Sequence, residues 1–309
     1  MLTFEKVNKF IVSDLTLHIP KGVAVGLIGP SGAGKTTLLR LACGLLKPES
    51  GEVYTLQKNP VEKRSALGPR LGCLLERMPV LEEEESVRDN LKKLQIIYRM
   101  SDKEFETEYT VLADAFELSA FEHSTVQGLS LGQRRRAELV AVLLHRPELL
   151  LLDEPTNGLD ETAKEALQEV LQERIKQGMT LVTASHNMRE VSGICNRIVL
   201  LEQGKLLYYG EEGALLRKYA PMDHMRLKVT GKLPDIDDLP VEKYVMEDEE
   251  LVLTYNSNHI TASEILEVLL KQCSVREVSI QKPDLADVIF AMRDRQMNPL
   301  SAKLKEDCK

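Results

Sequence analysis

The residues best suited to chemistry stand in one glycine-rich segment, Gly29-Pro30-Ser31-Gly32-Ala33-Gly34-Lys35-Thr36-Thr37. Its glycines allow a tight backbone turn in which successive N–H groups point at one anion. The ammonium group of Lys35 would reach the β- and γ-phosphates of a nucleotide, and the hydroxyl of Thr36 would ligate Mg²⁺. The segment therefore predicts a phosphate loop that binds a nucleoside triphosphate.

Two acidic residues, Asp153 and Glu154, follow a run of leucines at residues 149–152. A carboxylate at the end of such a buried strand would be costly without a partner, and the Mg²⁺ shell would supply that partner for Asp153. Glu154 would point elsewhere, and we expect it to orient and deprotonate the attacking water. The pair thus predicts hydrolysis of the terminal phosphate.

Hydrophobic periodicity predicts the elements that must position these groups. Residues 23–28 are typical of a buried strand that leads into the phosphate loop, and residues 38–46 place leucines at helical spacing after it. Residues 149–152 and 180–184 predict two further core strands, each preceded by a helix. Strands that alternate with helices indicate an α/β sheet that is largely parallel.

An amphipathic helical pattern covers residues 86–118. Its expected apolar side consists of Val87, Leu91, Leu94, Ile97 and Tyr98.

Two charged runs flank this region. The basic run at residues 134–136 is typical of a solvated helix start, with a lipid or nucleic-acid patch as the alternative. The acidic run at residues 82–85 is typical of a solvated loop, with a contact for a basic helix of a membrane partner as the alternative.

Three more motifs complete the set: Leu129-Ser130-Leu131-Gly132-Gln133, Asn157-Gly158-Leu159-Asp160, and His186 at the end of a predicted strand. In order and spacing, the motifs resemble those of the ATP-binding subunits of ABC transporters over about residues 1–218. Leu131 occupies a position where glycine is more usual in that family, and we treat the change as tolerated. The resemblance implies a P-loop NTPase fold of the ABC type, with a helical subdomain inserted at about residues 78–140.

The resemblance also implies how the motifs act on ATP. Ser130 and Gly132 lie too far along the chain to assume that they serve their own phosphate loop. The family pattern places the Ser130 hydroxyl and the Gly132 amide on the γ-phosphate held by a second subunit, with Gln133 in the same segment. Two subunits, identical or different, would then bury two ATP molecules in a two-fold head-to-tail dimer. Asp160 matches the turn that lies against the partner subunit, and His186 matches a switch histidine that registers the γ-phosphate.

Two positions leave a choice open. Phe10 stands where the family often places an aromatic ring against adenine, so it would either stack there or be buried in the core. Glu76 stands 41 residues after Lys35, where the family usually has a glutamine that touches Mg²⁺ and the water. A carboxylate is an oxygen ligand that Mg²⁺ accepts, but it adds negative charge beside the phosphates.

The composition changes near residue 220, which predicts an ABC ATP-binding domain at residues 1–220 and a small α+β domain at 221–309. Residues 226–230, 251–255 and 275–280 alternate like strands, and residues 260–270 predict a helix. The stretch at residues 282–289 is similar to the accessory domain that follows some bacterial exporter ATPases. This similarity favours export.

The net charge, the cysteines and the lengths of the apolar runs limit the possible functions of the protein. A net charge of −8 argues against a protein whose main task is to hold nucleic acid. The five cysteines, Cys43, Cys73, Cys195, Cys273 and Cys308, are scattered in a way that suits reduced thiols in a cytoplasm. No apolar run reaches the roughly 18–20 residues that cross a bilayer. We therefore expect a peripheral protein at the cytoplasmic face of the membrane, held there by a partner.

The implied function is ATP hydrolysis that powers transport through a separate integral-membrane permease. One alternative is a soluble ABC-type ATPase that acts on ribosomes or DNA. The single cassette and the absence of a heptad array weigh against it. The other alternative is an ATP-dependent regulatory module with weak hydrolysis, which Glu76 leaves open.

Overall fold

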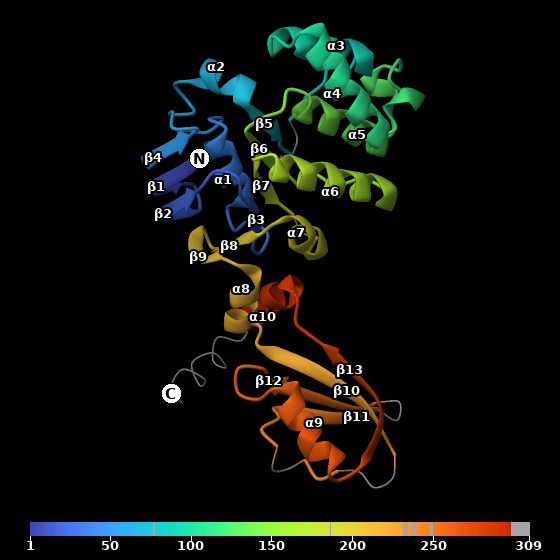
Figure 1. Cartoon of the computed structure of the whole chain (residues 1–309). Helices are drawn as coiled ribbons and strands as arrows, with labels where there is room; N and C mark the ends of the chain where they lie inside the picture. Colours follow the sequence, from blue (N-terminus) through green and yellow to red (C-terminus); the bar gives the residue numbers. More distant parts are fainter. Residues whose placement is uncertain (77, 186, 231–233, 237–238, 248–249, 298–309) are drawn as a thin grey trace. The chain divides into compact units, whose positions relative to one another are not determined.

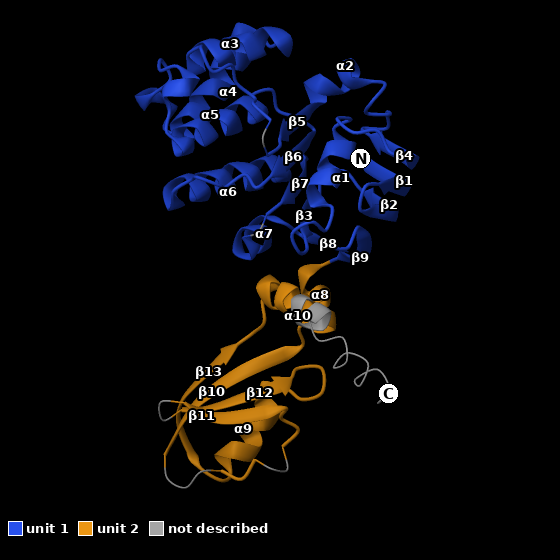
Figure 2. Ribbon diagram, turned by 180° about the vertical axis from the view of Figure 1, so that it is seen from behind, with its two compact units in different colours: residues 1–210 blue, residues 211–309 orange. Residues whose placement is uncertain are grey.

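The computed structural model describes the chain except for residues 77, 186, 231–233, 237–238, 248–249 and 298–309. The chain forms two compact units, residues 1–210 and residues 211–309 (Figure 2). The sequence had placed the division at residue 220. The difference is helix α8 (Glu212–Tyr219), which belongs to the second unit because it packs against α10 (Leu285–Met297).

The first unit is built on a six-stranded sheet with the order β5-β6-β7-β3-β8-β9 (Figure 1). Its strands are β3 (Ala24–Ile28), β5 (Leu71–Leu74), β6 (Leu149–Asp153), β7 (Thr180–Ala184), β8 (Arg197–Glu202) and β9 (Lys205–Gly210). All neighbours are parallel except β8 and β9, which confirms the predicted largely parallel α/β sheet. Ala184 pairs with both Leu27 and Asp153, so the carboxyl ends of β3, β6 and β7 meet at one edge of the sheet.

A second, antiparallel sheet with the order β2-β1-β4 covers the phosphate-loop helix. It consists of β1 (Leu2–Lys9), β2 (Val12–Ile19) and β4 (Ser50–Thr55), and the helix is α1 (Lys35–Ala42). Helix α1 contacts β4 of this sheet and β6 and β7 of the larger one, and buried side chains from both sheets form one core around it. The layers therefore hold α1, and with it the phosphate loop, on both sides.

The inserted helical subdomain contains α3 (Val87–Ile97), α4 (Asp102–Ala115) and α5 (Leu131–Leu143). Val87 and Leu91 are buried as predicted, whereas Ile97 is 65% exposed, so its assignment to the apolar side was wrong. At 100° per residue, Ile97 lies about 80° away from the stripe that Val87 and Leu91 define. The remaining helices of the first unit are α2 (Arg64–Leu67), α6 (Glu161–Lys176) and α7 (Met188–Ile194).

An ion cluster centred on a buried carboxylate joins the helical subdomain to the sheet domain. Glu108 of α4 is 4% exposed and accepts hydrogen bonds from Arg146 and from Arg174 of α6, which is 8% exposed.

Removing one charge from a buried pair leaves the other without compensation. We therefore expect Glu108→Gln to lower the free energy of unfolding by about 3 kcal/mol, measured by urea titration. The control, Glu106→Gln, removes an exposed carboxylate and should cost less than about 1 kcal/mol. Equal losses in the two variants would contradict the role of the cluster.

His145 gives the fold a dependence on pH. Its ring stacks on Tyr98 at a centroid distance of 3.8 Å, and its buried Nδ1 has no hydrogen-bond partner. Burial lowers the pKa of His145 from 6.5 to about 4. Between pH 6.5 and about pH 4, the folded chain therefore binds fewer protons than the unfolded chain. The free energy of unfolding should therefore fall as pH falls through this window, by about 2 kcal/mol from pH 7 to pH 5. Urea titrations of His145→Phe, which can keep the stack, should show a flatter pH profile; an unchanged slope would exclude His145 as its source.

The second unit is α+β, as predicted, with a four-stranded antiparallel sheet in the order β11-β12-β10-β13. Its strands are β10 (Met222–Thr230), β11 (Lys243–Glu247), β12 (Glu250–Asn256) and β13 (Ser274–Gln281), and α9 (Ala262–Leu270) packs on the sheet. The sequence had not predicted β11, whose side chains are mostly exposed and therefore lack an alternating apolar pattern.

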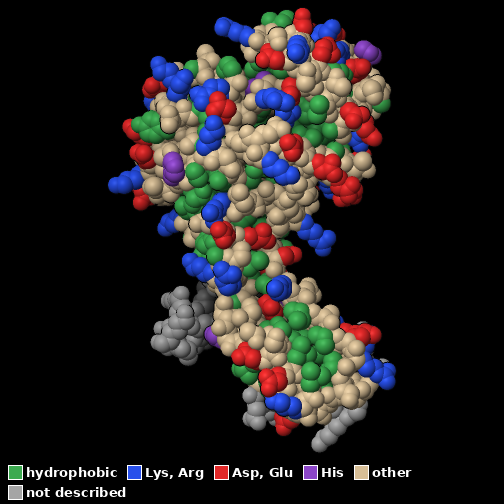
Figure 3. All heavy atoms as spheres, viewed as in Figure 1, with side chains coloured by type: hydrophobic (Ala, Val, Ile, Leu, Met, Phe, Trp, Pro, Cys, Tyr) green, Lys and Arg blue, Asp and Glu red, His purple; other side chains and the backbone are tan. Residues whose placement is uncertain are grey.

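On the face in view, acidic and basic side chains are interspersed over the first unit (Figure 3). None of the helices within the described part of the chain combines the length and apolar character that crossing a bilayer requires.

Candidate functional site

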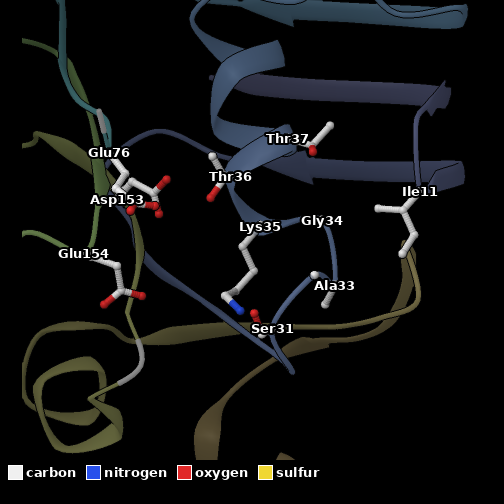
Figure 4. A pocket seen from close by; sticks show the side chains of 11 residues that line it. Ile11, Ser31, Ala33, Gly34, Lys35, Thr36, Thr37, Glu76, Asp153 and Glu154 are labelled. Atoms are coloured by element: carbon white, nitrogen blue, oxygen red, sulfur yellow. The ribbon is translucent and has the colours of Figure 1, made fainter. Parts of the chain in front are cut away.

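The predicted chemical groups meet in a cavity of about 210 Å³ at the carboxyl edge of the large sheet (Figure 4). Four segments contribute: the phosphate loop with the start of α1, the end of β6, the segment after β5, and the turn between β1 and β2. The lining residues are Ile11, Ser31, Gly32, Ala33, Gly34, Lys35, Thr36, Thr37, Glu76, Asp153 and Glu154. The parallel sheet thus brings together groups that lie more than 100 residues apart in the chain.

The phosphate loop needs its glycines for two different reasons. Gly29 has φ +148°, and a Cβ atom there would lie 2.2 Å from the carbonyl oxygen of Leu201, so no larger residue fits. Gly34 has φ +105° and precedes the first turn of α1, a conformation that side chains rarely adopt. As a result α1 begins at the cavity, where its free N–H groups and the positive end of its dipole favour an anion.

Lys35 is held inside this loop. It is 8% exposed, and its Nζ donates hydrogen bonds to the carbonyl oxygens of Gly29 at 2.8 Å and Pro30 at 3.1 Å. Burial lowers the pKa of Lys35, while the nearby charges of Glu154 and Asp153 raise it. The ammonium group is therefore preorganised beside the phosphate loop and electrostatically linked to the carboxylates.

Asp153 and Thr36 fit a divalent cation. Asp153 is 3% exposed, its Oδ2 is buried without a hydrogen-bond partner, and its carboxylate is hydrogen-bonded to the Thr36 side chain. Within the described residues, no group of three or more His, Cys, Asp or Glu side chains is arranged to hold a metal by itself. Mg²⁺ typically uses one or two carboxylates together with substrate phosphates and water, so this incomplete shell suits a metal that arrives with a nucleotide.

Glu154 turns into the cavity through an unusual backbone. Its φ is +49°, which is uncommon for a residue with a side chain, and its amide donates to the carbonyl oxygen of Ala184 at 2.8 Å. The side chain is 9% exposed and faces the same space as Lys35 (Figure 4). The turn gives the adjacent Asp153 and Glu154 different directions, as their two predicted roles require.

Glu76 lies in the cavity beside Asp153 (Figure 4). Burial raises the pKa of Asp153, the hydrogen bond with Thr36 lowers it, and the negative charge of Glu76 raises it further. The two carboxylates therefore interact even though Asp153 ends β6 and Glu76 lies in the segment after β5. This is the arrangement that a shared cation would stabilise.

Because the two carboxylates lie close together, we predict that Glu76→Gln changes the affinity for ATP and its dependence on Mg²⁺. Without metal, Glu76 repels the triphosphate; with Mg²⁺ it becomes a ligand or accepts a hydrogen bond from a metal-bound water. The variant should bind ATP more tightly than wild type in EDTA and show a flatter dependence on Mg²⁺ by calorimetry. Glu84→Gln, an exposed glutamate outside the cavity, is the control. The same Mg²⁺ dependence in Glu76→Gln and wild type would contradict the prediction.

The structure excludes one of the two alternatives for Phe10. The ring is 70% exposed, so a place in the core is excluded, and the Nζ atom of Lys9 lies 4.6 Å from its centroid. The neighbour Ile11, rather than Phe10, lines the cavity, although the sequence did not mark it as a site residue. Ile11 follows β1 in a turn, and no periodic pattern marks it.

The Leu129–Gln133 motif forms a second, separate cavity of about 590 Å³. Ser130, Gly132, Gln133 and Asp160 line it, and none of them lines the cavity of Lys35. Ser130 caps α5: its Oγ accepts from the Gln133 amide at 3.3 Å, and its amide donates to Gln133 Oε1 at 3.0 Å. The motif therefore presents a helix N-terminus at this cavity.

Ion pairs anchor this second cavity to the rest of the unit. Asp160 caps α6 by accepting from the Ala163 amide at 2.9 Å, and its Oδ2 accepts from Arg136 at 2.6 Å. Arg134 and Arg135 pair with Glu138. The three arginines do lie near the start of a helix, as predicted, but their side chains are half-buried rather than fully solvated, because the fold places a carboxylate beside each of them.

His186 lies outside the described residues. Asn187 and Thr156 donate hydrogen bonds to the carboxylate of Glu190 at 2.7 and 2.6 Å. Glu190 thus joins the start of α7 to the turn after β6. No sequence motif marked Glu190, because its partner Thr156 comes from a different strand–helix connection.

Comparisons with known proteins agree with this geometry. A family model described as "ABC transporter" matches residues 12–157. The Nod factor export ATP-binding protein I of Rhizobium leguminosarum bv. viciae is 35% identical over 212 residues, which cover 68% of each chain. The ABC transporter ATP-binding protein NatA of Bacillus subtilis is 31% identical over 64% of this chain and 81% of its own. The Nod factor export ATP-binding protein I of Bradyrhizobium diazoefficiens is 29% identical over 94% of each chain.

Solved structures show the same fold. An ATP-binding subunit of an ABC transporter superposes with a TM-score of 0.67 and 26% identity, over 71% of this chain and 92% of its own. A dimeric ATP-binding cassette in a post-hydrolysis state, bound to ADP and Pi, superposes with a TM-score of 0.62 and 25% identity, over 68% and 98%.

Proposed function

This chain belongs to the ABC transporter family of ATP-binding proteins, and from that premise we propose that two cassettes close head to tail around two ATP molecules. The cavity of Lys35 offers groups for the phosphates, the metal and the water. The cavity of Ser130 offers a helix N-terminus at a separate place on the surface. Pairing each cavity with the other cavity of a second subunit would surround the γ-phosphate from both sides.

Each group in the cavity has a defined task in this proposal. Lys35 and the N-terminus of α1 bind the phosphates, and Thr36 and Asp153, with Glu76, hold Mg²⁺. Bound Mg²⁺ would neutralise charge that develops on the transferred phosphoryl group. Glu154 accepts a proton from the attacking water, and Ser130 and Gly132 donate to the γ-phosphate of the partner's ATP.

The proposal of ATP hydrolysis rests on one observation: Lys35, the unpaired buried oxygen of Asp153 and the carboxylate of Glu154 meet in the same cavity. Steady-state phosphate release from the purified chain tests it, with and without Mg²⁺, and with Lys35→Ala as the inactive control. We expect Mg²⁺-dependent turnover that Lys35→Ala loses. Tight ATP binding with no turnover under any of these conditions would instead favour a regulatory module.

The proposed partner is an integral-membrane permease, which would hold the chain at the cytoplasmic face of the membrane. A cavity of about 350 Å³ lies between the end of α1, β5 and the end of α3, and Leu75, Met78 and Val80 line it. A helix docked there would touch the segment that carries Glu76 and so sense the nucleotide site. The names of the relatives that match 94% of the chain, second unit included, favour export.

Co-purification from native membranes tests the permease. We expect a polytopic membrane protein to accompany the wild-type chain and Val111→Glu, which changes an exposed apolar residue of α4 away from this cavity. Met78→Glu should lose it. Equal recovery with both variants would place the permease elsewhere.

A further inference from the structure

Two cysteines that play no part in nucleotide chemistry line the cavity of about 350 Å³. Cys43 follows the last residue of α1, and Cys73 lies in β5. Both are half-buried free thiols, and their side chains are hydrogen-bonded to each other. The fold therefore forms a dithiol from residues 30 positions apart, at the wall of a cavity that could admit a small molecule.

We propose that Cys43 and Cys73 form a thiol modification site that takes a low-molecular-weight disulfide of the glutathione class. The Cys43 thiolate forms a bond to one sulfur of the small disulfide, whose S–S bond breaks and releases one thiolate. The Cys73 thiolate then attacks the Cys43 sulfur, and the second small thiolate leaves. The products are a Cys43–Cys73 disulfide and two small thiols, which take up the two protons, so the protein pair is oxidised and the small disulfide is reduced.

The surroundings assign the order of the two steps. The hydrogen bond with Cys73 lowers the pKa of the Cys43 thiol against the effect of burial, and the charge of Arg64 lowers it further. The hydrogen bond with Cys43 and burial both raise the pKa of Cys73. Cys43 also caps the end of α1 and lines the cavity together with Arg64, whose guanidinium would stabilise a thiolate there. Because the thiolate is the nucleophile, we assign the first attack to Cys43 and the resolution of the mixed disulfide to Cys73.

The position of the pair gives the modification a consequence for the nucleotide site. Cys43 caps the end of α1, the helix that begins with Lys35 and Thr36, and Cys73 precedes Glu76 by three residues. A covalent bond would fix the end of α1 to β5. It would thereby restrain two of the segments that meet in the ATP cavity.

Cys273 provides a matched control in the same chain. It is also a half-buried free thiol, and, like Cys43 with Arg40, it donates to a backbone carbonyl oxygen at 3.4 Å, here that of Leu269. Burial raises the pKa of Cys273, whereas the pKa of Cys43 is lowered by its hydrogen bond with Cys73. The experiment uses the full chain with Cys308→Ser, because Cys308 lies outside the described residues. The purified protein is treated with oxidised glutathione, quenched at intervals and analysed by intact and peptide mass spectrometry.

We expect the chain to lose two hydrogen atoms and to yield a peptide pair linked through Cys43 and Cys73. Cys73→Ser should retain a glutathione adduct on Cys43, and Cys73→Ala replaces it if the serine variant fails to bind ATP. Cys43 should react at least about tenfold faster than Cys273. A stable Cys43 adduct in the chain with both thiols would overturn the proposal, and so would equal rates at Cys43 and Cys273.

Discussion

Glu154→Gln is expected to bind ATP as wild type does, to hydrolyse it about 10²–10⁴-fold more slowly and to accumulate as an ATP-bound dimer. The amide cannot accept the proton of the attacking water. Lys35, Thr36 and Asp153 remain in place, so the groups that hold the phosphates and the metal are unchanged. The amide also removes one of the charges that act on Lys35, which should not weaken its contact with an anion.

Two measurements check this expectation. Single-turnover phosphate release reports the chemical step separately from binding, and size-exclusion chromatography with light scattering reports the dimer. Glu173→Gln, which changes an exposed glutamate near the end of α6, is the matched control and should keep wild-type turnover. Undiminished turnover in Glu154→Gln would remove Glu154 from the mechanism.

Ser130→Arg is expected to abolish ATP-driven dimerisation while each subunit still binds nucleotide. Ser130 is exposed at the start of α5, in a cavity that does not include Lys35, so its replacement leaves the chain's own phosphate loop intact. In the proposed dimer, the long arginine side chain would occupy the space of the partner's γ-phosphate. ATP binding by calorimetry should therefore be retained, and the dimer should be lost.

The same substitution also removes a helix cap, which costs about 1 kcal/mol and needs a control. Ser101→Arg provides it, because Ser101 caps α4 with the same capping-box arrangement, formed with Glu104. That variant should lose comparable stability but keep the ATP-dependent dimer. Both are best compared in the Glu154→Gln background, where the dimer persists. A dimer that survives Ser130→Arg would refute the cross-subunit role of Ser130.

Groups whose chemistry is encoded over a few adjacent residues could be predicted without the fold. The glycines of the phosphate loop, with Lys35 and Thr36, are recognisable because a tight anion-binding turn and the helix after it are local structures. Asp153 and Glu154 are recognisable because a carboxylate after four buried leucines is costly without a specific partner. The alternation of strands and helices was likewise sufficient to predict the parallel sheet.

Which distant side chains meet could not be predicted before the fold was known. The electrostatic interaction of Glu76 with Asp153, the ion pair of Arg136 with Asp160 and the dithiol of Cys43 and Cys73 each link segments that sequence periodicity treats as independent. Such contacts depend on strand order and on the crossing of helices over the sheet, which side-chain alternation does not encode. The exposure of Phe10 was undecided for a related reason: an aromatic residue in a turn suits a core or a surface equally, and only packing distinguishes them.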